Sequence, residues 1–173
     1  MSDLSDQNNF YQEVRDILTH ARGRAVQSVN SVMVEAYWTI GKRIVEEEQG
    51  GESKAQYGKR LIEELSIKLS EEFGKGFSVA NLWNMRQFYL TYDDEGIRYA
   101  LRRELSWTHH RSIMRVEDKD ARAYYLETCA KENWSSRVLD RQIKTNTFQR
   151  LLSTEPKAIK EPSLSPRDKI LSQ

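Results

Sequence analysis

The sequence predicts an all-α protein, with a multi-helix domain that contains a helix-turn-helix-like unit and is preceded by long N-terminal helices. All three prolines lie at or beyond Pro156, so residues 1–155 contain no helix-breaking proline. The same stretch is rich in Leu, Ala, Glu, Arg and Lys, which favour helices. Apolar residues recur at helical spacing, and no alternating stretch of strand length occurs.

The N-terminal part is expected to be a pair of long helices over residues 9–50, after a flexible N-terminus over residues 1–8. Asn9 and Gln12 fit a capping box at the start of the first helix. Gly23 is expected to break or bend this stretch, and a Gly-Gly pair is expected to end the second helix in a loop.

The remainder is expected to form one helix-turn-helix-like helical domain over residues 51–152. Its first two helices cover residues 57–73 and 79–92, and Ser78 is the expected N-cap of the second. Further helical segments are expected at about 99–103, 106–115, 119–132 and 136–152, with Asp118 and Ser135 as caps of the last two. Pro and Ser then interrupt the periodicity, which indicates a linker or disordered tail over residues 153–173.

Composition restricts the possible partners and the compartment. The formal net charge is +1, from 27 basic and 26 acidic residues, so DNA binding would need a local basic face. The single cysteine, Cys129, cannot pair within the chain and indicates a reducing compartment. No apolar run reaches the ~18 residues of a membrane helix, and the polar N-terminus has no signal-peptide core. We therefore expect a cytoplasmic protein with no membrane partner.

The helices at 57–73 and 79–92 have the outline of a helix-turn-helix, whose second helix enters the major groove of DNA. At about 100° per residue, helix 79–92 has an apolar side, which Val79, Trp83 and Leu90 extend, and an opposite polar side. The predicted groove-facing residues are Asn81, Asn84, Gln87 and Thr91. Asn and Gln can pair with the adenine edge, and the alternative interpretation is an ordinary solvated face.

Basic residues further along the chain form a candidate phosphate-contacting surface. Arg137, Arg141 and Lys144 share one face of the helix predicted at 136–152. The alternative is a solvated surface that contains an Asp140–Lys144 pair. The predicted phosphate-contacting residues are Arg102, Arg103, Arg111, Arg137, Arg141 and Lys144. Arg86 lies within the apolar arc of helix 79–92 instead, and is expected to pair with a carboxylate or to snorkel.

No catalytic residue, metal ligand or cofactor is predicted. A PD-(D/E)XK nuclease site needs carboxylates and a lysine on strands, whereas the Glu-x-Lys at Glu117 lies near a helix end. His109 and His110 point about 100° apart on a helix, and Cys129 has no ligand partner at useful spacing. His109 and Cys129 are expected to be packing residues, and the chain is expected not to be an enzyme.

Several runs of residues, in order over about residues 10–152, resemble the N-terminal module of the YhcG family. The runs are AYWTIGKRI from Ala36, YGKRLIEELS from Tyr57, FGKGFS from Phe73, NLWNMRQFY from Asn81, LSWTH from Leu105 and NWSSR from Asn133. In that family this module precedes a PD-(D/E)XK nuclease domain and is regarded as a helix-turn-helix DNA-binding domain. The resemblance implies a module that places a nuclease on DNA, with the nuclease domain as a partner in cis or in trans. This sequence stops in the proline-containing segment, so we expect the nuclease domain to be absent from it.

A fainter similarity links residues 105–114, LSWTHHRSIM, to the LSxGHARxLL segment of ParB-type helix-turn-helix DNA-binding domains. In those proteins the segment also follows the helix-turn-helix. Thr108 stands where they have a glycine. The similarity implies a shared helical DNA-binding architecture, and it implies neither a partition function nor nucleotide binding.

The leading hypothesis is a non-catalytic DNA-binding module of a PD-(D/E)XK-type nuclease system. The alternative is a helical dimerisation or protein-docking module with no direct DNA contact. Long apolar-striped N-terminal helices, four Trp and eight Tyr, and the balanced charge favour the alternative. The family resemblance favours the leading hypothesis. A homodimer is compatible with both, because helix-turn-helix proteins often bind DNA as dimers.

Overall fold

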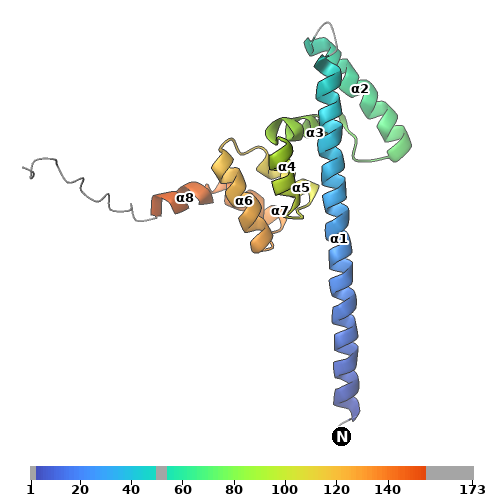
Figure 1. Ribbon diagram of the computed structural model, residues 1–173, viewed down its shortest axis with the longest axis vertical. Coiled ribbons are helices and arrows are strands. Elements are labelled where there is room, and N and C mark those ends of the chain that lie inside the picture. The colour runs from blue at the N-terminus through green and yellow to red at the C-terminus, as the bar shows by residue number, and fades with distance from the viewer. Residues whose placement is uncertain (1–2, 50–53, 155–173) are drawn as a thin grey trace, which may run out of the picture.

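A computed structural model describes residues 3–49 and 54–154 of the 173-residue chain. These residues form eight helices and no strand, which confirms the all-α prediction. The helices are α1 (Asp3–Gln49), α2 (Lys54–Phe73), α3 (Val79–Thr91), α4 (Asp94–Leu101), α5 (Trp107–Ile113), α6 (Lys119–Lys131), α7 (Ser136–Lys144) and α8 (Thr147–Thr154). Helix α2 turns back from the end of α1, and α3 to α8 gather on one side of α1 (Figure 1).

The N-terminal part is one helix rather than the predicted pair. Helix α1 has 47 residues and runs without interruption from Asp3 through Gly23 to Gln49, a length of about 70 Å. The capping box predicted at Asn9 therefore does not start the helix, because Asn9 lies inside it, and residues 3–8 of the N-terminus that was expected to be flexible belong to α1. A glycine in a helix interior costs only about 1 kcal/mol relative to alanine, which a long proline-free helix can absorb.

The long helix has two parts with different surroundings. Residues 11–33, which we call the stem, project away from the other helices (Figure 1), and nearly all of their side chains are exposed. From Val34 onward α1 packs against the remaining helices, and this part of α1 together with α2 to α8 is called the head. The predicted domain boundary between residues 50 and 51 therefore does not coincide with the packing, because Val34 and Trp38 lie in the head core.

Helix α1 reaches the centre of the head. The indole Nε1 of Trp38 donates a buried hydrogen bond to the backbone oxygen of Tyr92, at 2.9 Å. A Cβ atom built on Gly41 would lie 2.0 Å from the backbone oxygen of Met85, so only glycine allows α1 and α3 to approach this closely. The core also contains Phe88, which is fully buried beside the ring of Tyr92.

Local signals in the sequence identified most of the helix starts in the head. The side chains of Ser78, Asp118 and Ser135 cap α3, α6 and α7, as predicted. The segment predicted as one helix at 136–152 is instead two helices, α7 and α8, separated near Asn146, which has a positive φ of 52°. Helix α4 begins at Asp94, earlier than the piece predicted at 99–103. Of the predicted tail, only residues 153 and 154 are described, and they end α8.

Candidate nucleic-acid interface

Helices α2 and α3, where the sequence predicts a helix-turn-helix-like unit, are consecutive helices joined by a short turn. The turn between them contains Gly74 and Gly76, whose positive φ values of 76° and 113° are conformations that favour glycine. The hydroxyl of Ser66 in α2 donates to the backbone oxygen of Phe77 at 2.7 Å and holds the turn against α2. Helix α3 is thereby fixed between α1, α2 and α5, with Met85 on its buried side.

The exposed side of α3 is more apolar than predicted. Val79 and Trp83 are each 38% exposed and Leu90 is 50% exposed. These three side chains, predicted to extend the apolar side of the helix, are thus exposed. The buried face of α3 is instead centred on Met85 and Phe88, because α1 and α5 both pack against that side of the helix.

The four predicted groove residues do not form a free polar face. Asn81 is half-buried, and its amide donates to the backbone oxygen of Gly76 at 2.5 Å. Its side-chain oxygen accepts from the indole of Trp107 at 2.9 Å. The hydroxyl of Thr91 donates to the backbone oxygen of Gln87 at 2.8 Å. Asn84 is half-buried, so Gln87 is the most accessible of the four.

Arg86 is held by a carboxylate, as its position in the apolar arc predicted. Its Nε lies 2.9 Å from both side-chain oxygens of Glu48 at the end of α1. Its guanidinium also lies over the ring of Trp83, 5.4 Å from the centroid. Arg86 thus joins α3 to α1.

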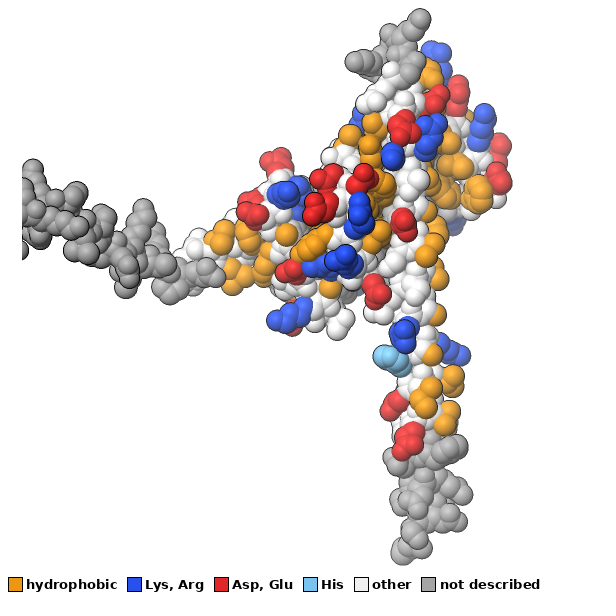
Figure 2. All heavy atoms as spheres, in the orientation of Figure 1, with side chains coloured by type: hydrophobic (Ala, Val, Ile, Leu, Met, Phe, Trp, Pro, Cys, Tyr) orange, Lys and Arg blue, Asp and Glu red, His pale blue; other side chains and the backbone are white. Residues whose placement is uncertain are grey.

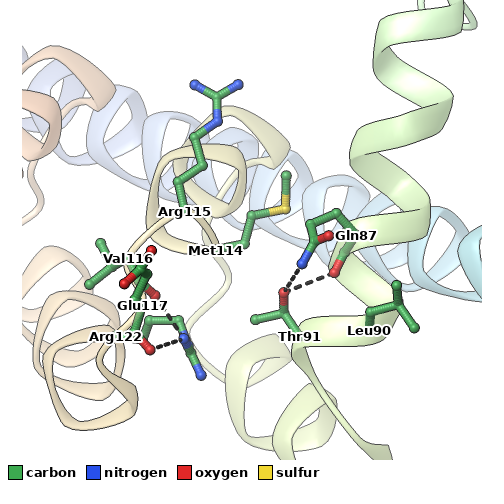
Figure 3. Close-up of a pocket in the computed structure, with 8 residues that line it drawn as sticks. All are labelled: Gln87, Leu90, Thr91, Met114, Arg115, Val116, Glu117 and Arg122. Atoms are coloured by element: carbon green, nitrogen blue, oxygen red, sulfur yellow. Dashed lines mark hydrogen bonds between the residues drawn. The ribbon is translucent and has the colours of Figure 1, made fainter.

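A groove separates α3 from the connection between α5 and α6 (Figure 3). It measures about 550 Å³, and its lining includes Gln87, Thr91 and Arg115. Arg122 donates to the backbone oxygens of Val116 at 2.7 Å and Glu117 at 2.9 Å, so it holds the wall of the groove. The exposed side chain of Arg115 points away from Arg122 (Figure 3) and has no hydrogen bond or ion pair within the described residues.

Helix α7 presents the predicted basic stripe. Arg137, Arg141 and Lys144 are all exposed, and their spacing along α7 puts them on one face. The side chain of Asp140, the acidic residue between them, accepts a hydrogen bond from the Ser112 hydroxyl of α5 at 2.6 Å. Within residues 3–49 and 54–154, none of the three basic side chains forms an ion pair, and the alternative Asp140–Lys144 pair does not occur.

The other three predicted phosphate-contacting residues differ in availability. Arg102 is exposed at the end of α4. Arg103 is engaged: it bonds to Glu127 at 2.9 Å and lies over the ring of Tyr99, 3.6 Å from the centroid. The hydrogen bond from the Tyr99 hydroxyl, and then that from Arg103, holds the pKa of Glu127 below its usual value. Arg111 is half-buried, and its Nε is buried without a partner among the described residues.

The histidines of α5 and the cysteine of α6 are packing residues, as predicted for His109 and Cys129. The ring of His109 bonds to the Ser106 hydroxyl at 2.6 Å and to the backbone oxygen of Trp134 at 2.8 Å. Burial raises the pKa of the Cys129 thiol to about 11. Burial, and then the nearby His109, lowers the pKa of His110 to about 3. In the part of the chain that the structure describes, no three His, Cys, Asp or Glu side chains gather as a metal site.

Comparison with known proteins places the chain in a family. Residues 13–150 match the family model described as the DUF1016 N-terminal domain. The chain belongs to this family. It is also similar to an Escherichia coli (strain K12) protein named "Putative nuclease YhcG", with 34% identity over an alignment of 181 residues. The alignment covers 86% of this chain and 48% of the relative. The chain thus spans about half the length of that curated relative. No solved structure matches the chain.

The DUF1016 N-terminal domain match includes almost all of the stem and nearly the whole described head. It confirms the resemblance to the N-terminal module of the YhcG family. None of the described helices is long and apolar enough to span a membrane.

Sequence reasoning missed Arg115 as a free cation beside the groove. An Arg at the end of a short helix is not distinctive, and only the fold brings Arg115 opposite Gln87.

Proposed function

We propose that this chain is a non-catalytic DNA-binding module of a nuclease system, and that it holds DNA mainly through phosphate contacts from α7. The observation that carries the proposal is the row of three exposed cations, Arg137, Arg141 and Lys144, with no carboxylate partner among the described residues. Phosphate contacts supply much of the affinity of a protein for DNA and carry no sequence information directly.

The local charge around α7 supports this proposal despite the balanced charge of the whole chain. Residues 136–150 contain four basic residues and one acidic residue, Asp140. The side chain of Asp140 accepts a hydrogen bond from the Ser112 hydroxyl and forms no ion pair with the basic side chains of α7 among the described residues. Arg102 and Arg115 are further exposed cations in the head. The similarity to a protein named as a nuclease supports a role beside a nuclease.

Base readout by α3 has less support than phosphate contact. Asn81 would have to break hydrogen bonds to Gly76 and Trp107 before its amide could pair with a base. The exposed apolar side chains of Trp83 and Leu90 also offer no hydrogen-bonding groups to a base edge, apart from the indole N–H of Trp83. We therefore propose that α2 and α3 mainly stabilise the fold of the head. Of the four predicted groove-facing residues, at most Gln87 would contact a groove of the DNA.

The test is fluorescence anisotropy of labelled duplex DNA across a range of salt concentrations. The variant combines Arg137→Gln, Arg141→Gln and Lys144→Gln. We expect its affinity at low salt to fall by at least about tenfold. The log–log salt slope should shrink by roughly 0.9 for each phosphate that the variant no longer neutralises. In parallel, the unmodified chain incubated with DNA and Mg²⁺ is expected to leave the DNA uncut.

The matched control removes the same number of charges from α2. Lys59, Arg60 and Lys68 are exposed there, and their replacement by Gln is expected to leave the salt slope unchanged. An equal loss of affinity in the two variants would mean that bulk charge and not α7 binds DNA. Absence of binding at low salt to duplex, single-stranded and branched DNA would reject the proposal and favour the docking module without DNA contact.

A further inference from the structure

The stem carries an apolar stripe that nothing in the described protein covers. Its members recur at spacings of four and three residues along one side of α1: Val14, Leu18, Ala21, Ala25, Val29 and Val32. Leu18 is 54% exposed, Val29 61% and Val32 64%. Figure 2 shows hydrophobic side chains along one edge of the projecting helix. We call these six residues the stem stripe.

The stem stripe faces away from the head. The α1 residues that contact the head core continue from Val34 through Trp38. At about 100° per residue, this buried face lies roughly opposite the stem stripe on the helix. The described head therefore leaves the stripe uncovered, and a second molecule can reach it.

The stem lacks the side-chain packing that gives most helices in proteins their stability. Short isolated helices are marginal in water, and most helical stability in proteins comes from packing of an apolar face. The stem has Gly23 in its middle, which weakens the helix by about 1 kcal/mol relative to alanine. A partner along the stripe would therefore stabilise the helical stem.

We propose that the partner is a second copy of this chain, and that two stems pack side by side through their stem stripes to form a homodimer. The stripe repeats every eleven residues: Val14 to Ala25, Leu18 to Val29, Ala21 to Val32. An eleven-residue repeat gives a nearly straight pair of helices with a slight right-handed supercoil. A regular stripe of this kind is complementary to itself, as a two-fold interface requires.

The length of the patch fits a pair of stems. Besides the stripe, the stem exposes Tyr11 on the same side, whereas Ile17, Val26 and Met33 lie further round the helix. From residue 11 to residue 32 the apolar strip is about 30 Å long. Two stems face to face would cover this strip along its whole length.

The charges of the stem argue against a lipid surface as the partner. Helices that lie on membranes carry a polar face rich in Lys and Arg. Residues 11–33 contain three arginines, two carboxylates and no lysine, which gives a net charge of +1. The side opposite the stripe carries Gln12, His20, Gln27 and the acidic Asp16, and no basic side chain. Near-neutral stems can approach each other without strong repulsion.

The apolar surface continues from the stem into the head. A groove of about 410 Å³ lies between α1 and α2, and its lining includes Ile40, Leu61 and Leu65. Ile40 is eleven residues after Val29, so it continues the repeat of the stem stripe. The proposed interface therefore has room to extend beyond the stem.

The test measures the mass of the full chain by light scattering and sedimentation over a wide range of concentrations. We expect twice the 20.3 kDa mass of one chain. The variant combines Leu18→Asp and Val29→Asp in the stem stripe, and it is expected to weaken the dimer by on the order of 100-fold or more, because two carboxylates would be buried without partners. Amide hydrogen exchange in residues 11–33 is expected to become fast in this variant.

The matched control combines His20→Asp and Gln27→Asp, which adds the same charge on the opposite side of the stem. It is expected to remain dimeric. All four tryptophans, Trp38, Trp83, Trp107 and Trp134, lie in the head, so their fluorescence reports whether the head of each variant is folded. A wild-type chain of monomeric mass at every concentration overturns the proposal. A dimer that survives the stripe variant, or that dissociates equally in the control, also overturns it.

Discussion

The indole Nε1 of Trp107 donates a hydrogen bond to the side-chain oxygen of Asn81 at 2.9 Å. This bond joins the first turn of α3 to the first residue of α5. The amide of the same asparagine bonds to the backbone oxygen of Gly76 in the turn before α3. Trp107 also packs against Phe88 and Tyr37, so the pair lies where α1, α3 and α5 meet.

The first prediction follows from this pair. Asn81→Ala removes the bond to Gly76 and leaves the half-buried N–H of Trp107 without a partner. We expect the free energy of unfolding to fall by about 1–3 kcal/mol in a urea titration. DNA affinity, measured under conditions where the variant is fully folded, is expected to be unchanged. The exposed Gln87→Ala is the control and should change stability by less than about 0.5 kcal/mol. An unaltered stability together with a loss of DNA affinity would restore Asn81 as a groove residue.

The two glycines of α1 predict opposite effects of the same substitution. A Cβ on Gly41 would meet the backbone oxygen of Met85 at 2.0 Å, and a backbone carbonyl cannot turn aside as a side chain can. We expect Gly41→Ala to destabilise the head by about 2 kcal/mol or more, despite the gain in helix propensity.

Gly23→Ala is the matched control on the same helix. Nothing lies within 4 Å of a Cβ at Gly23, so alanine should stabilise the stem by roughly 0.5–1 kcal/mol. Thermal unfolding followed by circular dichroism measures both variants. If Gly41→Ala left the thermal stability unchanged, α1 and α3 would not be in close contact.

These glycines illustrate what the sequence can and cannot predict. Caps such as Ser78 and Ser135 were predictable because a cap is a local signal within three residues. Local sequence does not distinguish Gly23, which is open on all sides, from Gly41, which lies at a helix crossing. Nor did it reveal that α1 is one helix, because a glycine weakens a helix without fixing where the helix ends.

The candidate site also combines features that local sequence predicts with features that depend on the fold. The spacing of Arg137 and Arg141 predicted a shared face, because both residues lie on one helix. Whether these cations were free depended on Asp140, whose partner Ser112 lies 28 residues away in sequence. Apolarity placed Trp83 on the apolar side of α3, whereas the positions of α1 and α5 decide which part of that side is covered.

The ion pair between Arg86 and Glu48 predicts strong coupling between the ends of α1 and α3. The side chain of Glu48 is only 12% exposed and that of Arg86 is 29% exposed, at a distance of 2.9 Å. Glu48→Gln leaves a partly buried guanidinium without its countercharge, and we expect a loss of about 1–3 kcal/mol. The double variant Glu48→Gln/Arg86→Met should lose less than the sum of the single variants. Additive losses in this double-mutant cycle would show that the pair contributes no coupling.

The buried His110 predicts that the protein loses stability in mild acid. Its ring packs against Phe88, and its two nitrogens have no hydrogen-bond partner within the described residues. Burial, with a smaller effect of His109, lowers its pKa from 6.5 to about 3. Between these two values the unfolded chain binds a proton that the folded chain does not. Stability is therefore full above about pH 6.5 and falls as the pH drops toward 3, by up to about 1.4 kcal/mol per pH unit.

Urea unfolding at a series of pH values between 7 and 4.5 measures this effect, with His110→Phe as the comparison. Phenylalanine places a ring of similar shape beside Phe88 and cannot take up a proton. We expect the variant to lose the part of the pH dependence that His110 causes, and to be as stable as the parent or more so near pH 5, because it removes two buried polar atoms that have no partners. Parallel pH profiles for the parent and the variant would contradict this account, since the titrating group would then lie elsewhere.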